Sequence, residues 1–335
     1  MPIKQIGSSD PKYLAATDIL IGDMSDTNYE FLLFDRPIIL LANEWLRENF
    51  PDIGIKTDLN GLEDAIKRSS ENPDEFKKER LYWLKKTIHQ PDGNSSKRVL
   101  AGIIDKSGMK NPRFLFIHGN NSVKRNTLLP LYEEAKREGF KAKEIVQGPV
   151  KDRNDAIIYI AANNKDIGFH GGFKVHLDHG VKGEGVLILE REIRHYQKNN
   201  YFPTVDLHVT EGETSFETTK ILVGSYKDRV AMVGYPKSDH LLKFNTMRNK
   251  MSVYNKLGFD LDKPLVTYAP ANQQAEGKPG GSLSEEVIEK LKEISQKSDY
   301  NILVKLKYPG ASFPVRLLVR SKRLIAGILR ATWPE

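Results

Sequence analysis

Short apolar runs alternate with longer amphipathic stretches along this chain. The apolar runs are rich in isoleucine, leucine and valine and predict buried strands, whereas the amphipathic stretches predict helices. The predicted strands span residues 18–21, 36–41, 113–118, 143–147, 175–177, 204–209, 230–233, 264–269 and 301–306. The predicted helices span residues 28–33, 62–70, 73–89, 95–106, 127–138, 152–162, 214–223, 239–257 and 283–296. Alternation of strands with helices is typical of parallel sheets, so the pattern predicts an α/β fold.

The length and composition favour two α/β lobes. A chain of 335 residues is too long for one ordinary compact domain. It contains no cysteine, which excludes disulfides, zinc–thiolate sites and thiol catalysis and fits a reducing cytoplasm. No apolar run approaches the roughly 18–20 residues that span a bilayer, and residues 1–10 lack the apolar core of a signal peptide. No cluster of metal ligands stands out, so we expect neither an obligatory metal nor a cofactor.

The net charge of +7 favours an anionic partner. Nucleic acid, an acidic membrane surface and a phosphate-rich substrate all meet that condition. The sequence has no zinc-finger spacing, no aromatic RNA-binding signature and no long basic stripe, so nucleic acid is the least favoured of the three. Residues 313–333 combine five basic side chains with an apolar face. That composition is typical of a helix that binds the surface of an anionic membrane, and an ordinary packed terminal helix is the alternative.

Two polar turns that follow predicted strands are candidates for chemistry. Residues 21–26 leave a strand and enter a helix, where free N–H groups and the Ser25 hydroxyl suit a phosphate. Ser25, Asp26 or Thr27 acting only as an N-cap is the alternative. In the glycine-rich loop 178–185, His179 precedes Gly180 and is suited to act as a base near neutral pH. A histidine bonded to the loop backbone is the alternative there.

Three further segments end predicted strands. Gly234 and Pro236 lie in a tight turn, and Ser238 or Asp239 is expected to cap the helix that follows. The strand 264–269 ends at Pro270. The last predicted strand, 301–306, ends in basic residues, which offer positive charge for a diphosphate unless they are simply solvated. These lysines are Lys305 and Lys307.

The motifs together resemble those of the CDP-glycerol glycerophosphotransferases, the teichoic-acid-type polymerases. The segments Val233-Gly-Tyr-Pro-Lys-Ser-Asp-His-Leu-Leu242 and Leu265-Val-Thr-Tyr-Ala-Pro270 are similar to paired runs of that family. The family also has a His-Gly loop, a Ser-Asp-Tyr-Ser-Ser-like turn and a Lys-Pro-Ile-Ile strand. Their counterparts here are His179-Gly180, Ile21-Gly-Asp-Met-Ser-Asp26 and Arg36-Pro-Ile-Ile39. The resemblance implies the GT-B fold, in which two Rossmann-like lobes enclose the active site.

The order of these motifs differs from that of the family. The turn at 21–26 comes first here. In the family it follows a lysine-containing strand, whose counterpart here is the predicted strand 301–306. The resemblance therefore implies a circular permutant, or alternatively a fragment that spans two family copies. The implied parts are residues 1–60 as the second half of a donor-binding lobe, 61–110 as a helical crossover, 111–257 as an acceptor-side lobe, 258–312 as the first half of the donor-binding lobe and 313–335 as a basic tail.

The resemblance implies transfer of a phosphopolyol from a CDP-linked donor to an acceptor hydroxyl. His179 would be the base, Ser25 and its neighbours would hold the donor phosphates, and the two strand-end lysines would offset charge on the leaving CMP. Family acceptors are lipid-linked polymers of the cell envelope, which implies a cytoplasmic protein on the inner membrane face. A nucleotide-sugar glycosyltransferase or a UDP-sugar 2-epimerase on the same fold is an alternative.

Local departures from the family favour another alternative, a degenerate nucleotide- or anionic-polymer-binding protein without activity. Asn272 and Gln273 replace an aromatic–arginine pair, and Tyr308 replaces a histidine. Asp26 replaces the second serine of the phosphate turn. Each change removes a hydrogen-bond donor or adds negative charge near the expected diphosphate.

Overall fold

The computed structural model describes residues 3–7, 10–23, 25–118, 122–145, 155–160, 171–177, 180, 204–270, 285–297 and 299–306. Several sequence predictions lie outside these residues. They are the predictions for His179, Lys307, Asn272, Gln273, Tyr308 and the tail 313–335.

Within the described residues the chain forms two parallel sheets, each with six strands. Sheet A has the order β1-β12-β11-β2-β3-β4, with strands Lys4–Gly7, Asn301–Leu306, Leu265–Tyr268, Ile19–Gly22, Ile38–Leu41 and Ile55–Thr57. Sheet B has the order β10-β9-β8-β7-β5-β6, with strands Val230–Met232, Leu207–Thr210, Phe173–Leu177, Asp155–Ile160, Arg113–Ile117 and Ala142–Ile145. The predicted α/β class is confirmed.

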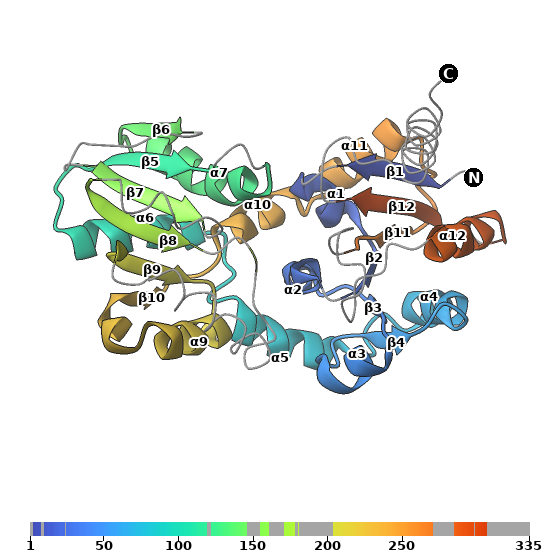
Figure 1. Ribbon diagram of the computed structural model, residues 1–335. Helices are drawn as coiled ribbons and strands as arrows, with labels where there is room; N and C mark the ends of the chain where they lie inside the picture. Colours follow the sequence, from blue (N-terminus) through green and yellow to red (C-terminus); the bar gives the residue numbers. More distant parts are fainter. Residues whose placement is uncertain are drawn as a thin grey trace, which may run out of the picture.

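Each sheet forms a lobe with its helices, and two connections join the lobes (Figure 1). The helices of lobe A are α1 (Pro11–Ala16), α2 (Asp26–Phe31), the 3-10 helix η1 (Leu32–Phe34), α3 (Glu44–Asn49), α4 (Leu62–Glu71), α11 (Met247–Leu257) and α12 (Glu285–Lys297). The helices of lobe B are α6 (Ser95–Ser107), α7 (Ser122–Arg137), α9 (Glu213–Val223) and the 3-10 helix η4 (Gly224–Arg229). The connecting helices are α5 (Lys77–Thr87) and α10 (Pro236–Phe244), which contact both lobes.

Apolar side chains from the strands pack against helices on both faces of sheet A. On one face, Ile21 of β2 packs in a buried cluster with Ile66 of α4 and Leu291 of α12. On the other face, Leu303 of β12 packs with Tyr254 of α11. Sheets covered on both faces have nearly continuous apolar strands, which is why the strand pattern was visible in the sequence.

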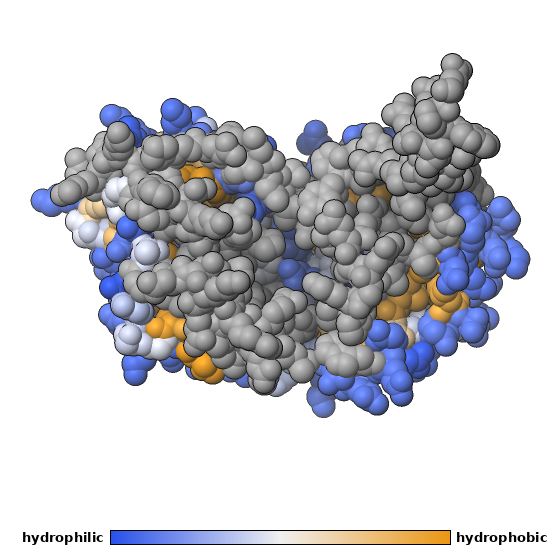
Figure 2. Space-filling view, in the orientation of Figure 1, coloured by the Kyte–Doolittle hydropathy of each residue, from blue (hydrophilic) through white to orange (hydrophobic). Residues whose placement is uncertain are grey.

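Helices α6 and α7 cover one face of sheet B. Phe114 of β5 packs there with Val99 of α6 and Leu131 of α7. Hydrophilic residues lie along the outer sides of both lobes and in the hollow between them (Figure 2). No helix among the described residues is long and apolar enough to cross a membrane.

Sheet A joins segments that are far apart in the chain. β11 pairs with β2, and Val266 is in register with Ile19. β1 pairs with β12, and Ile6 is in register with Lys305. The predicted strands 18–21, 36–41, 264–269 and 301–306 therefore lie in one parallel sheet, as expected if residues 1–60 and 258–312 form one lobe.

Some predicted elements were wrong or missing. Residues 152–162 were expected to be a helix, but they contain the strand β7, because a short isoleucine-rich run pairs with β5 and β8. The helix expected over 239–257 is divided into α10 and α11, and Thr246 caps the second by accepting a hydrogen bond from Asn249 N at 3.2 Å. β1, α1, α3 and β4 have three to six residues each and were not predicted.

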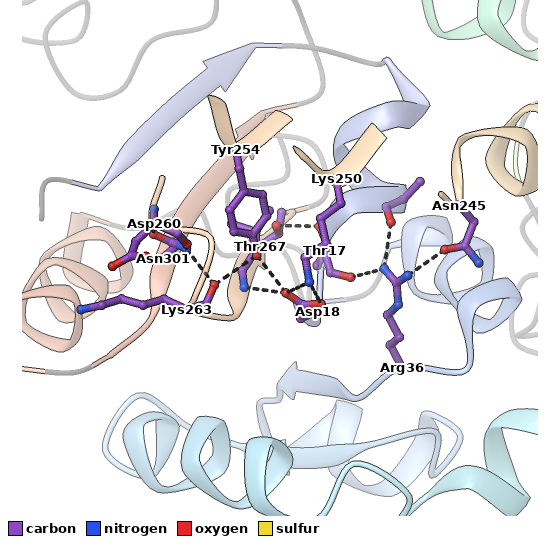
Figure 3. Close-up of polar contacts among 12 residues, drawn as sticks. Thr17, Asp18, Arg36, Asn245, Lys250, Tyr254, Asp260, Lys263, Thr267 and Asn301 are labelled. Atoms are coloured by element: carbon purple, nitrogen blue, oxygen red, sulfur yellow. Dashed lines mark hydrogen bonds and ion pairs between the residues drawn. The ribbon is translucent and has the colours of Figure 1, made fainter. Parts of the chain in front are cut away.

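A polar cluster fixes α11 to the amino-terminal edge of sheet A (Figure 3). Asp18 accepts hydrogen bonds from Lys250 Nζ at 2.6 Å and from the Tyr254 hydroxyl at 3.0 Å, both on α11. It also accepts one from the backbone N–H of Leu265 at 2.8 Å. Burial, and then the charge of Asp18, raise the pKa of Tyr254, so this phenol stays protonated and donates. The cluster thus holds α11, which follows the connecting helix α10, at the amino-terminal edge of sheet A. The candidate site lies at the opposite edge, where the strands end.

Candidate functional site

The carboxyl-terminal ends of strands from both sheets meet at α2. β2 leads through Gly22 and Asp23 into this helix. Gly180, just after β8, and Tyr235, just after β10, both contact α2 from lobe B. Ligands of parallel α/β proteins bind at the carboxyl ends of strands, so this lobe boundary is the candidate site.

Ser25 begins α2 as its N-cap. Its Oγ accepts a hydrogen bond from Thr27 N at 3.3 Å, and its own N–H donates to Asp23 O at 2.9 Å. Asn28 donates from Nδ2 to the same Asp23 carbonyl at 2.5 Å. The capping interpretation of Ser25, one of two left open by the sequence, is therefore observed.

The first turn of α2 lies against Gly180 of lobe B. A Cβ atom added to Gly180 would lie 1.9 Å from Oδ2 of Asp26, so the Asp26 side chain would have to move to make room for it. The structure thus brings together two motifs that the sequence predicted independently. His179, the preceding residue and the predicted base, lies outside the described residues.

Glu30, on the same helix, forms a buried polar cluster with lobe B. Its Oε1 accepts a hydrogen bond from the Tyr235 hydroxyl at 2.8 Å, and both of its carboxylate oxygens lie 2.7 Å from Lys237 Nζ. The side chains of Glu30 and Lys237 are only 5% and 12% exposed. Burial, and then the charge of Glu30, raise the pKa of Tyr235 well above its ordinary value, so its hydroxyl remains a donor.

Glu30, Tyr235 and Lys237 were not among the predicted site residues. Tyr235 and Lys237 lie within the Gly-Tyr-Pro-Lys run. The sequence therefore indicated the segment that contains them, but not their contact with Glu30. Glu30 had a weaker signal, which is its charge between Tyr29 and Phe31, two aromatic residues that are fully buried.

Glycine and proline shape the turn that presents Tyr235. Gly234 has a φ angle of +102°, a conformation that residues with a Cβ rarely adopt. A Cβ atom there would lie 2.7 Å from Ser95 Oγ and 2.8 Å from the backbone carbonyl of His89. Pro236 is the first residue of α10, where a missing N–H costs no hydrogen bond.

Asp239 caps a helix other than the expected one. Its carboxylate accepts hydrogen bonds from Ser95 N at 3.0 Å and Ser96 N at 2.7 Å, at the start of α6. The prediction that Ser238 or Asp239 caps its own helix was wrong, because α10 begins at Pro236. Asp239 lies in the first turn of α10 and points to the neighbouring helix.

The remaining predicted residues lie on β12 or just after β11, in the same sheet as β2. Pro270 is buried just after β11. Lys305 is partly buried in β12. Because β11 separates β12 from β2, Lys305 lies two strands away from the strand that leads to Ser25.

Acidic groups predominate in the described part of the site. Asp23, Glu30 and Glu211 are buried at this edge, and the charges of Glu211 and Asp26 also raise the pKa of Tyr235. Within the described residues, no group of three or more histidine, aspartate or glutamate side chains is arranged to hold a metal ion. At this polar boundary between the lobes, the start of α2 in lobe A faces Gly180, just after β8 of lobe B.

Comparison with known proteins identifies one family. Residues 8–105 match the family model described as CDP-Glycerol:Poly(glycerophosphate) glycerophosphotransferase, which covers a little under a third of the chain. Searches of curated proteins and of solved structures found no match. The matched segment contains β2, the turn at Ser25 and all of α2, so it supplies the lobe A side of the candidate site. Through residues 8–105, this chain is similar to the CDP-glycerol:poly(glycerophosphate) glycerophosphotransferase family.

Proposed function

We propose that this protein transfers a phosphopolyol, such as glycerol phosphate, from a CDP-linked donor to an acceptor hydroxyl. The observation that carries the proposal is the contact between Asp26 and Gly180. It joins a turn in the family-matched segment to Gly180 of the other lobe, the glycine of the His-Gly pair in the sequence. In this proposal lobe A binds the donor and lobe B the acceptor, in a GT-B arrangement.

The proposed chemistry is an attack of the acceptor oxygen on the donor phosphorus that carries the polyol. The bond from this phosphorus to the bridging oxygen breaks, CMP leaves, and His179 takes the acceptor proton. N–H groups at the start of α2, with Ser25 and Thr27, hold the donor phosphates. Lys305 and Lys307 offset charge on the leaving CMP. Catalysis then rests on positioning and electrostatics, as in other phosphoryl transfers.

Release of CMP is the direct test. The protein is incubated with CDP-glycerol, CDP-ribitol or a UDP-sugar, together with a polyol-phosphate acceptor, and CMP and UDP are quantified. We expect CMP from a CDP-polyol, and we expect His179→Ala to slow its release by roughly 10²–10⁴-fold with nearly unchanged donor affinity. Release of UDP instead would point to a glycosyltransferase or epimerase, and wild-type turnover in the alanine variant would make His179 an ordinary loop residue.

The acidic side chains favour a second candidate, which is binding without transfer. Asp26 adds a carboxylate at the turn that is proposed to hold the diphosphate, and Glu30 and Glu211 are buried nearby. A protein of this kind would bind a nucleotide or an anionic polymer and release no CMP. Calorimetric titration with CDP-glycerol, run beside the release assay, separates the two candidates.

The acceptor and the location in the cell belong to the same proposal. A lipid-linked acceptor would place the protein on the inner face of the cell membrane, and the basic tail 313–335 would supply attraction to anionic lipid. The net charge of +7 supports such a partner.

A further inference from the structure

We propose that Glu30 is a positioning residue for the transfer reaction. Held by Tyr235 and Lys237, its carboxylate sets the location of the phosphate-binding turn of α2 relative to lobe B. The inference rests on the proposed function and deepens it. It assigns a positioning role to Glu30, a residue that does not itself take part in the proposed transfer.

The geometry begins with one face of a short helix. Asp26 and Glu30 are four residues apart on α2 and therefore lie on the same helix face. Asp26 lies against Gly180 after β8, and Glu30 bonds to Tyr235 after β10. The same face of α2 thus touches two strand ends of lobe B. Any shift of Glu30 moves Ser25, the N-cap of this six-residue helix, as a unit with it.

Apolar packing alone does not define this position. Tyr29 and Phe31 of α2 belong to a buried cluster that also contains Leu241 of α10. Apolar contact is non-directional and tolerates sliding, whereas hydrogen bonds require short distances and defined angles. The three polar contacts of Glu30, at 2.7 to 2.8 Å, restrict how α2 can lie relative to Tyr235 and α10.

The cluster is better explained by geometry than by stability. Desolvation offsets most of the attraction in a buried ion pair, and apolar replacements are often neutral or stabilising. A buried pair that links two lobes can nevertheless specify one arrangement of them. A misplacement of about 1 Å at a reacting centre is enough to lower turnover on the order of 100-fold.

The first measurement is the arrangement of the lobes. Because the chain has no cysteine, Lys67→Cys and Glu138→Cys provide two exposed labelling sites, on α4 and on lobe B. Spin-label distance distributions are recorded for this background, for Glu30→Gln and for the control Glu213→Gln, which breaks an exposed pair between α5 and α9. We expect a shifted or broadened distribution for Glu30→Gln alone. An unchanged distribution would overturn the proposal whether or not the protein is a transferase.

The second measurement is CMP release from CDP-glycerol by the full chain. Glu30→Gln should lower kcat at least tenfold while KM for CDP-glycerol changes less than threefold. In the double variant Glu30→Gln/Lys237→Met, which leaves no unpaired charge, the melting temperature should recover but kcat should stay low. Recovery of kcat together with the melting temperature would show that Glu30 is only structural.

A conservative variant covers the case in which Glu30→Gln does not fold. Glu30→Asp keeps the charge but shortens the side chain, so it should fold and still lose kcat, because α2 must move to keep its contacts. Wild-type kcat in folded Glu30→Asp, with an unchanged label distance, would overturn the proposal. Absence of CMP release by the wild type, with a label distance that still depends on Glu30, would instead refute the proposed function alone.

Discussion

Gly234 shows, at the scale of a single residue, how closely the two connections between the lobes approach each other. Its missing side chain lets the turn before α10 pass within van der Waals distance of His89 and Ser95. His89 lies between α5 and α6, and Ser95 is the first residue of α6, so both belong to the other connection. A residue marked in the sequence as part of a turn is therefore also a contact point between segments about 140 residues apart.

Replacing Gly234 by alanine should destabilise the protein through two separable effects. The positive φ angle costs about 1–2 kcal/mol for any residue with a Cβ, and the clash with the His89 carbonyl adds to this cost. Gly139→Ala is the matched control, because Gly139 has a φ angle of +84° and nothing within 4 Å of an added Cβ. In urea unfolding, Gly234→Ala should lose clearly more free energy than Gly139→Ala. Equal losses would mean that the turn moves aside at no cost.

The buried His208 should make stability depend on pH. Burial, and then the neighbouring His176 and Arg229, lower the pKa of His208 well below 6.5. In the unfolded chain this histidine takes up a proton near pH 6.5, whereas in the native protein it stays neutral there. Unfolding therefore takes up a proton below pH 6.5, and the free energy of unfolding falls as the pH is lowered from 6.5.

The variant His208→Leu should remove this contribution. The slope of the unfolding free energy between pH 6.5 and 5 should decrease by up to about 1.4 kcal/mol per pH unit. Above pH 7.5 the slopes of the variant and of the wild type should coincide, which provides an internal control. Identical slopes at every pH would assign the acid sensitivity to other groups.

At the scale of secondary-structure elements, helix ends join parts of the chain that are distant in sequence. Asp239 of α10 satisfies two backbone N–H groups at the start of α6, from residues that are 143 and 144 positions earlier in the chain. The side chain that accepts hydrogen bonds from the first N–H groups of a helix normally belongs to the residue immediately before that helix. Here that position is Asn94, whose side chain makes no capping hydrogen bond, so Asp239 takes over its role from another helix.

Asp239→Ala should therefore destabilise α6 by about 1–2 kcal/mol, the usual cost of a lost N-cap. Asp105→Ala is the control, since Asp105 is an exposed carboxylate on the same helix, away from its start. Thermal or urea unfolding should separate the two variants, and hydrogen exchange should localise the difference to the first turn of α6. Equal stabilities would argue that solvent replaces the Asp239 carboxylate without cost.

Elements with a strong period of apolar residues could be predicted from the sequence, and elements defined by distant partners could not. β2 and β11 were predicted because their runs are continuous and buried. β7 was mistaken for a helix, since a short apolar run does not distinguish a strand from a helix until its neighbours are known.

Ser25 and Gly180 were predicted as site residues because they follow strands. Glu30 was missed, because its partner Tyr235 is 205 residues away in the chain.

At the scale of the whole molecule, sheet A combines four strands from the beginning of the described chain with two from its end, and these two, β11 and β12, lie between β1 and β2. Residues 19–57 and 265–306 therefore share one sheet. How the motif order arose within the family stays a prediction. In the sequence, the basic tail 313–335 follows β12, the last described strand of the lobe that is proposed to bind the donor.

Deleting residues 313–335 should weaken binding to anionic vesicles if this tail holds the protein on the membrane. Each basic residue near an anionic leaflet contributes about 1 kcal/mol, and salt screens this attraction. Co-sedimentation with vesicles that contain phosphatidylglycerol, at low and high salt, measures the effect, and vesicles of phosphatidylcholine are the control. Undiminished binding by the truncated protein would locate the lipid contact elsewhere on its basic surface.

The interleaved order of sheet A has a consequence for synthesis on the ribosome. β2, β3 and β4 emerge about 200 residues before β11, the neighbour that β2 requires. At roughly 5–20 residues per second, these apolar strands wait for about 10 to 40 s while lobe B is made and folds beside them. An unpaired strand edge exposed for that long is a site of aggregation. We therefore expect the yield of folded protein to depend on chaperones that shield nascent chains, more than it would for the same two sheets encoded one after the other.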